Sequence, residues 1–205
     1  GLQSTTNLAS PAFWAPVSPA PVVLNGQNTV TNLISGNCRF YRLVRPGHQT
    51  WATVADMPTA RDSLGAAAGS DGRIYAIGGE DASGPWDAVE AYTPGTPGTW
   101  SPMASMPSAR YGLAVIAGAD GRIYAIGGAV FAGLVATLEV YTPSSDSWAT
   151  KASMPTARAY LAAAAGADGR IYAIGGEDDA GPVATVEVYT PSSDSWATAT
   201  SMPTA

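Results

Sequence analysis

Residues able to act as nucleophiles, bases or metal ligands are few in this chain, and they limit its chemistry. The sequence holds one histidine, His48, and one cysteine, Cys38. One histidine cannot supply a site that needs two histidine ligands, and a lone cysteine cannot form a disulfide within the chain. Residues 49–205 contain no histidine, which excludes a Ser-His-Asp set within that part of the chain. We therefore expect no catalytic residues, no metal and no cofactor.

Carboxylates are more abundant and offer two other kinds of chemistry. The run Glu177-Asp178-Asp179 has oxygen ligands of the kind that Ca²⁺ prefers. It lacks the alternating spacing of a calcium loop, and Ala129-Val130 occupy the corresponding place one repeat earlier. Pairs of acids could also act on sugars. A structural or solvating role explains each of these acids more simply.

Charge divides the chain into two parts. Residues 1–50 contain three arginines and no acid, whereas the rest contains sixteen acids against six arginines and one lysine, a net charge of −9. The change predicts a boundary near residues 46–50, with a first domain at 1–46 and a second at 47–205. An acidic chain with a single lysine, Lys151, is a poor candidate for binding nucleic acid. The longest apolar runs are too short to span a membrane as a helix.

The elements that position these residues come from a repeat. Asp-Gly-Arg-Ile-Tyr-Ala-Ile-Gly-Gly occurs at 71–79, 120–128 and 168–176. Asp-Gly predicts a two-residue hairpin with positive φ at both positions, and Ile-Tyr-Ala-Ile predicts a short buried strand. Four tryptophans, at 51, 100, 148 and 196, are separated by 49, 48 and 48 residues. A period of this length predicts a repeat architecture.

Each repeat divides into four strands joined as a meander. The first strands, at 63–68, 112–117 and 160–165, are rich in Ala and Gly, and the third strands lie at 89–92, 138–141 and 186–189. Four strands in about fifty residues are typical of a β-propeller blade. Because blades converge on an axis, the strand with the smallest side chains is expected to be innermost. The predicted fold class is all-β, with four-stranded antiparallel blades.

These motifs resemble the kelch repeat. The Gly-Gly pair, the Val-Glu-Val-Tyr strand, the downstream Trp and the Met-Pro-x-Ala-Arg link recur in order over about residues 51–205. The resemblance implies three blades, at about 51–99, 100–147 and 148–195, and the start of a further unit at 196–205. Three blades do not close a ring. We expect either that these residues are part of a longer polypeptide or that copies of the chain associate through their exposed blades.

Residues 1–46 do not share the repeat. Val22-Val23-Leu24 precede the turn pair Asn25-Gly26, and alternating patterns at 29–34 and 39–44 predict two further strands. This short β segment, in which Trp14 is expected to pack, resembles the end of a sandwich module of secreted bacterial proteins. Together with the sparse Lys and Cys content, the resemblance suggests an extracellular or cell-surface location in a bacterium.

Strand order places the links before the first strands beside the loops after the second strands, so these segments form one candidate binding face. The recurrence of its arginines favours a scaffold role, in which each arginine bonds loop carbonyls or an acid of the neighbouring blade. Residues that break the repeat are better binding candidates. Arg73, Arg122 and Arg170 are expected to pair across strands with Glu90, Glu139 and Glu187. The candidate face comprises Arg61, Asp62, Glu80, Asp81, Arg110, Tyr111, Phe131, Arg158, Glu177, Asp178 and Asp179, with Ala159 as a further position that follows an arginine.

The kelch resemblance implies a non-enzymatic binding or scaffold module for a protein or glycan partner. One alternative is a structural subunit whose blades associate between chains into a filament or ring. A second is part of a sugar-acting enzyme with its active site on further blades. Galactose oxidase resembles kelch proteins in its propeller, but its copper site uses His and Tyr ligands that His48 and Cys38 cannot replace.

Overall fold

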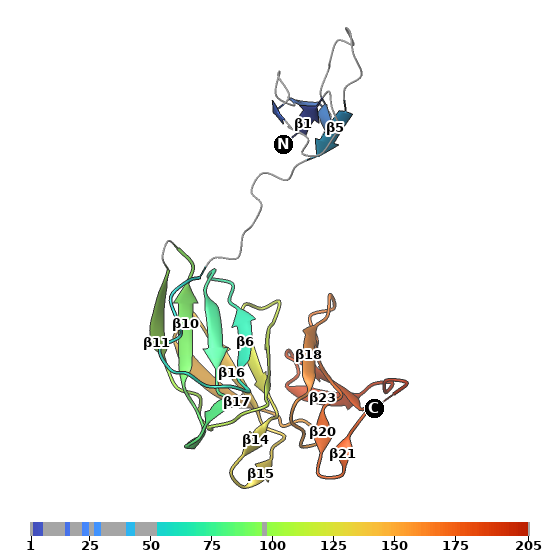
Figure 1. Cartoon of the computed structure of the whole chain (residues 1–205). Helices are drawn as coiled ribbons and strands as arrows, with labels where there is room; N and C mark the ends of the chain where they lie inside the picture. The colour runs from blue at the N-terminus through green and yellow to red at the C-terminus, as the bar shows by residue number, and fades with distance from the viewer. Residues whose placement is uncertain are drawn as a thin grey trace. The chain divides into compact units, whose positions relative to one another are not determined.

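Strands and the turns between them make up all the secondary structure of the described residues. The computed structural model describes residues 53–95 and 98–204 in full and, before them, the backbone of five short strands. No helix occurs in these parts of the chain, which confirms the predicted all-β class. Contacts divide the chain into two units, residues 1–53 and 54–205 (Figure 1).

The first unit contains two small groups of paired strands. β1 (Leu2–Thr5) pairs antiparallel with β2 (Ala15–Pro16) and with β5 (Phe40–Leu43). β3 (Val22–Leu24) pairs antiparallel with β4 (Gln27–Thr29), as the turn pair between them predicts. The predicted strand at 29–34 lies outside the described residues after Thr29, and so does Trp14.

The second unit contains three four-stranded antiparallel sheets, one for each repeat, and they confirm the predicted blades. Blade 1 consists of β6 (Gly65–Ala68), β7 (Ile74–Ile77), β10 (Val89–Thr93) and β11 (Thr99–Met103). Blade 2 consists of β12 (Ala114–Ala117), β13 (Ile123–Ile126), β16 (Leu138–Thr142) and β17 (Ser147–Lys151). Blade 3 consists of β18 (Ala162–Ala165), β19 (Ile171–Ile174), β22 (Val186–Thr190) and β23 (Ser195–Thr198).

A two-stranded hairpin extends the loop between the second and third strands of every blade. The hairpins are β8 (Glu80–Asp81) with β9 (Gly84–Pro85), β14 (Ala129–Val130) with β15 (Gly133–Leu134), and β20 (Glu177–Asp178) with β21 (Gly181–Pro182). The Gly-Gly pairs precede these hairpins. Gly78 and Gly79 both have positive φ, 66° and 100°, and a Cβ on Gly78 would lie 2.6 Å from the carbonyl oxygen of Arg110. The pair therefore allows the backbone to turn against the next link.

The first strands lie at the centre of the second unit, where small residues are required. β12 lies between β6 and β18. A Cβ on Gly65 of β6 would lie 2.1 Å from a methyl carbon of Val115 in β12, so a larger residue does not fit there. The expectation that the Ala- and Gly-rich strand is innermost agrees with this contact.

Adjacent blades bury their apolar faces against each other. Tyr75 and Ile77 of blade 1 pack with Ile123 and Tyr141 of blade 2. The same positions one repeat later, Tyr124 and Ile126, pack with Ile171 and Tyr189, and these side chains are almost wholly buried. Burial of aromatic and branched side chains on this scale supplies the main force that joins the blades.

Polar contacts fix the outer strands to the neighbouring link. The indole nitrogen of Trp148 in β17 donates to the carbonyl oxygen of Ala104 at 2.9 Å, and Trp196 donates to Ala152 at 2.8 Å. Asp146 accepts hydrogen bonds from the backbone N–H of Ala104 and from the Tyr141 hydroxyl. The repeated tryptophans thus connect successive repeats.

The Asp-Gly turns differ from the prediction. The loop after β6 runs from Gly69 to Arg73, and only Gly72 of the Asp-Gly pair has positive φ, 81°. The Asp71 carboxylate instead accepts the backbone N–H and the Nε–H of Arg73 and the Tyr75 hydroxyl. These hydrogen bonds hold a longer loop than a two-residue hairpin.

Candidate binding surface

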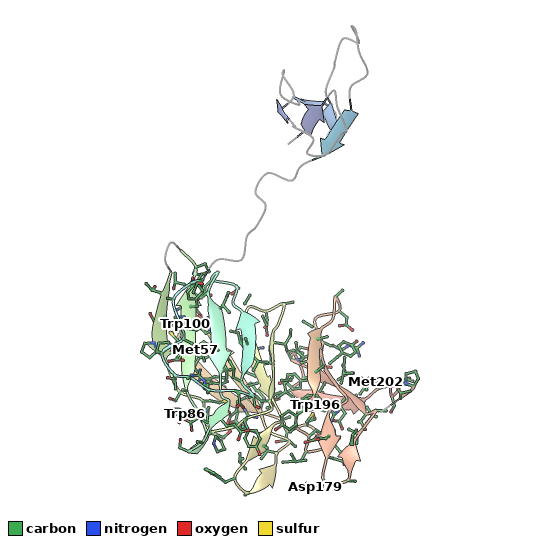
Figure 2. The ribbon with its side chains drawn as sticks, in the orientation of Figure 1. Met57, Trp86, Trp100, Asp179, Trp196 and Met202 are labelled. Carbon is green, nitrogen blue, oxygen red and sulfur yellow. The ribbon has the colours of Figure 1, made fainter. Side chains whose placement is uncertain are left out.

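The links before the first strands and the second-to-third hairpins lie side by side, as predicted. Backbone bridges join them in every blade, at Asp62 and Glu80, at Tyr111 and Ala129, and at Ala159 and Glu177. We call the surface formed by these links and hairpins the loop surface. Figure 2 shows Asp179 at the tip of the β20–β21 hairpin, at the end of the blades where β14 and β15 also lie.

The three link arginines do not reach the loop surface. The side chains of Arg61, Arg110 and Arg158 have no exposed area. Arg110 Nη1 donates to the carbonyl oxygens of Gly127 and Thr137, at 2.7 and 3.0 Å. The expectation that these arginines line the binding face is therefore corrected, and their scaffold role is the one that the geometry supports.

Each buried arginine pairs with the glutamate of its own blade, so the expected bond to an acid of the neighbouring blade is wrong. Arg61 lies 2.6 Å from Glu90, Arg110 lies 2.8 Å from Glu139, and the third pair, Arg158 and Glu187, is also separated by 2.8 Å. Burial lowers the pKa of Arg110, and the charge of Glu139 opposes that shift. The pairs tie the link to the third strand from within the protein.

The predicted cross-strand pairs between strand-opening arginines and these glutamates are wrong. Arg73 pairs with Asp71, Arg122 with Asp120, and Arg170 with Asp168, in the loop just before each second strand. Because the link arginines already occupy the glutamates, the strand-opening arginines bond to the nearer acid. Arg73 also lies over the Tyr75 ring, 5.2 Å from its centroid.

The other predicted residues are distributed along the loop surface. Asp62 and Asp179 are exposed, and Glu80, Asp81, Tyr111, Glu177 and Asp178 are half-buried. Phe131 is 83% exposed, and it lies against Gly84 of the neighbouring hairpin, where a Cβ would meet the Phe131 ring. Ala159 is buried, so its methyl group is not accessible on the loop surface. Whether these residues bind a partner stays a prediction.

One residue of the loop surface was missed by the sequence reasoning. Tyr160 is 55% exposed, and its ring lies 6.4 Å from that of Tyr111 in an edge-on arrangement. Its place in the repeat is taken by Ser63 and Gly112, and all three have positive φ. The break from small residues to Tyr was the available signal, but the sequence pattern assigned Tyr160 to a first strand.

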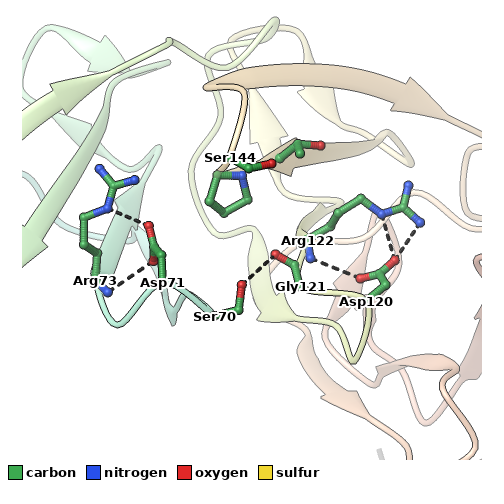
Figure 3. A pocket seen from close by; sticks show the side chains of 9 residues that line it. Ser70, Asp71, Arg73, Asp120, Gly121, Arg122 and Ser144 are labelled. Atoms are coloured by element: carbon green, nitrogen blue, oxygen red, sulfur yellow. Dashed lines mark hydrogen bonds and ion pairs between the residues drawn. The ribbon is translucent and has the colours of Figure 1, made fainter.

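The opposite face of the blades carries two similar hollows. One, of about 530 Å³, lies between the turns of blades 1 and 2 and is lined by Asp71, Arg73, Asp120 and Arg122 (Figure 3). The other, of about 480 Å³, lies at the next junction. The charged groups of both hollows already form ion pairs within their own loops. Their recurrence and pairing favour a scaffold role.

The described residues hold neither a metal-binding cluster nor a membrane-spanning helix. No group of three or more His, Cys, Asp or Glu side chains in residues 53–95 and 98–204 is placed to hold a metal ion. The same residues contain no helix that could cross a membrane.

Comparisons with known proteins bear on the repeat and the fold. The family model described as "Kelch motif" matches residues 63–107, 110–155 and 158–203, one match to each blade. A solved structure titled "Structure of YjhT" aligns with a TM-score of 0.62 at 18% sequence identity. The alignment covers 73% of this chain and 54% of that one, so the chain spans about half the length of YjhT. A search of curated proteins with the sequence finds no match.

Proposed function

Because the chain belongs to the kelch-motif family, we propose that it is a non-enzymatic module that binds a protein or glycan partner through the loop surface. Loops held by a rigid scaffold are where binding residues concentrate. In this proposal the module works outside the cell or at the surface of a bacterium. The observation that carries it is the exposure of Tyr160 and Phe131, which break the repeat on this face.

A matched pair of substitutions tests which face binds. Ala132 and Ala119 are both exposed turn residues of blade 2, the first on the loop surface and the second on the opposite face. The full chain is applied to peptide and glycan arrays, and the binding of Ala132→Trp and Ala119→Trp to each hit is compared with that of the unchanged chain. The proposal predicts that only Ala132→Trp weakens binding. Loss with Ala119→Trp alone, or turnover of sugars by the chain, contradicts it.

A second candidate function, association between copies, has an observation of its own. Ile74 in β7 is 42% exposed, whereas Ile123 and Ile171, at the same place in the next two blades, are almost wholly buried against the preceding blade. Blade 1 therefore presents the face that blades 2 and 3 use for packing. The occupant proposed for it is a blade of a second copy of the chain.

The mass of the chain in solution tests this second candidate. Sedimentation of the full chain is expected to show association that Ile74→Glu abolishes. Val54→Glu serves as the control, because Val54 is 51% exposed but lies in a link outside the sheets. A chain that is monomeric at all concentrations, or association that survives Ile74→Glu, contradicts the candidate.

A further inference from the structure

An aromatic pair of one exposed and one half-buried tyrosine is built from the links of two different blades. Tyr111 and Tyr160 contact each other edge-on, and Tyr160 extends over Gly112, where a Cβ would lie 3.0 Å from its ring. The backbone N–H of Tyr160 donates to the carbonyl oxygen of Gly112 at 2.7 Å. The ring is thus held at a fixed place on the loop surface while more than half of the residue stays open to solvent.

Three acidic residues lie on the same loop surface as the pair. Asp62 and Glu80 are joined by two backbone hydrogen bonds of 2.9 Å, and Glu177 bonds through its backbone to Ala159, the residue before Tyr160. Burial, the charge of the ionised Tyr111 hydroxyl and the charges of Glu80, Glu177 and Asp62 raise the pKa of Tyr160. None of the three acids forms an ion pair within residues 53–95 and 98–204.

The arginines of the described unit do not neutralise this charge. All six of them are paired with other acids, three inside the blades and three on the opposite face. An aromatic face attracts cations through its π electrons, and carboxylates at its rim add Coulomb attraction. An anionic ligand would be repelled here.

Building on the proposed function, we propose that the loop surface binds a basic peptide segment, with one lysine or arginine side chain seated on Tyr160 and Tyr111 between Asp62, Glu80 and Glu177. The negative charge of the surface selects this occupant from the protein and glycan partners of the proposed function. A neutral sugar can stack on the rings and donate hydroxyl hydrogen bonds to the carboxylates, but it carries no net charge for the three uncompensated carboxylates to attract.

The test uses a fluorescein-labelled octapeptide of alternating Gly and Lys, titrated into the full chain and followed by fluorescence anisotropy. The same peptide with Glu in place of Lys and a neutral oligosaccharide competitor are the comparison ligands. We expect only the Lys peptide to bind, with affinity that falls about tenfold or more between low and high salt. Tyr160→Gly is expected to weaken binding about tenfold, and Tyr160→Phe, which keeps the ring, to retain it. Glu80→Gln with Glu177→Gln should reduce both the affinity and its dependence on salt.

The repeat supplies the control for folding. Ser63→Gly makes the same backbone change at the same place in blade 1 without removing a ring, and it should bind the Lys peptide as the unchanged chain does. Equal binding by Tyr160→Gly, salt-independent binding, or preference for the Glu peptide or the oligosaccharide overturns the inference. If array hits are blocked by Ala132→Trp but are not basic, the inference fails and the proposed function stands. If Ala132→Trp blocks no hit, the proposed function itself fails.

Discussion

Arg110 and Glu139 lie 29 positions apart in the chain and form an ion pair of 2.8 Å in which both side chains are almost wholly buried. The arginine also bonds the carbonyl oxygens of Gly127 and Thr137, which flank the hairpin of blade 2. A single side chain thereby connects the link, the hairpin and the third strand. The same pair recurs in blades 1 and 3, so buried ion pairs support the loop surface in all three blades.

Removal of this arginine should destabilise the second unit strongly. Arg110→Met leaves the Glu139 carboxylate buried with the Ser108 hydroxyl as its remaining side-chain partner. We expect the free energy of unfolding to fall by about 3–5 kcal/mol, the usual cost of a buried charge without its partner. Urea unfolding monitored by tryptophan fluorescence measures it. The double variant Arg110→Met/Glu139→Gln should recover part of the loss, and an equal loss in both variants would contradict this account.

Two glycines with similar backbone angles should differ in their tolerance of a side chain. Gly127 and Gly169 have φ of 61° and 76°. A Cβ on Gly127 would lie 2.5 Å from the carbonyl oxygen of Arg158, whereas a Cβ on Gly169 meets nothing within 4 Å. Gly169→Ala should cost roughly 1–2 kcal/mol of unfolding free energy from the backbone alone. Gly127→Ala should cost about 1–3 kcal/mol more. Urea unfolding of both variants measures the two losses. Equal losses for Gly127→Ala and Gly169→Ala would exclude the close contact as the cause.

The acid of the blade 3 turn should make stability depend on pH. Hydrogen bonds from the backbone N–H of Arg170, the Tyr172 hydroxyl and the Arg170 side chain lower the pKa of Asp168 to about 2. Because the pKa is lower in the folded state, this stabilisation is present above the unfolded pKa of about 4 and is lost as pH falls toward 2. Asp168→Asn should therefore lower the melting temperature at pH 7, and the difference should shrink between pH 4 and pH 2.5. A difference that stays constant over that range would rule out Asp168 as its source.

Tyr160 should contribute little to stability. It occupies the left-handed region, φ 52°, where non-glycine residues cost roughly 1–2 kcal/mol, and Gly112 fills the same place in blade 2. We expect Tyr160→Gly and Ser63→Gly to leave the unfolding free energy unchanged or to raise it by up to about 1 kcal/mol. Thermal unfolding of the two variants beside the unchanged chain measures this. A loss above 1 kcal/mol for Tyr160→Gly alone would mean that the ring stabilises the fold.

Much of the fold could be predicted from spacing. The repeated nine-residue motif located the second strands, and the tryptophans located the fourth, because these residues meet the same neighbours in every blade. Ala and Gly in the first strand indicated the crowded centre, which the contact of Gly65 with Val115 explains. The length of the Asp-Gly loop could not be predicted, because the Asp71 carboxylate sets it by bonding Arg73 and Tyr75.

The candidate site was predicted less well, because whether an arginine side chain is exposed depends on which acid it pairs with in the fold. The sequence assigned Glu90 to Arg73, which opens the adjacent strand, whereas the packing of the link beneath the hairpin brings Arg61 to it instead. Tyr160 was hidden for a different reason. Its neighbours in sequence are alanine and leucine, so it matched a strand pattern, whereas its contact with Tyr111 comes from the adjacent blade.

The links at the centre of the second unit carry one bond that repeats at every junction. The backbone N–H of Gly112 donates to the carbonyl oxygen of Ser63 at 2.8 Å, and the N–H of Tyr160 donates to that of Gly112 at 2.7 Å. Each link therefore donates its N–H to the link of the preceding blade and offers its carbonyl oxygen to the link of the following blade, whatever its side chain. Because the bond uses backbone atoms alone, the same junction forms with serine, glycine or tyrosine at this position.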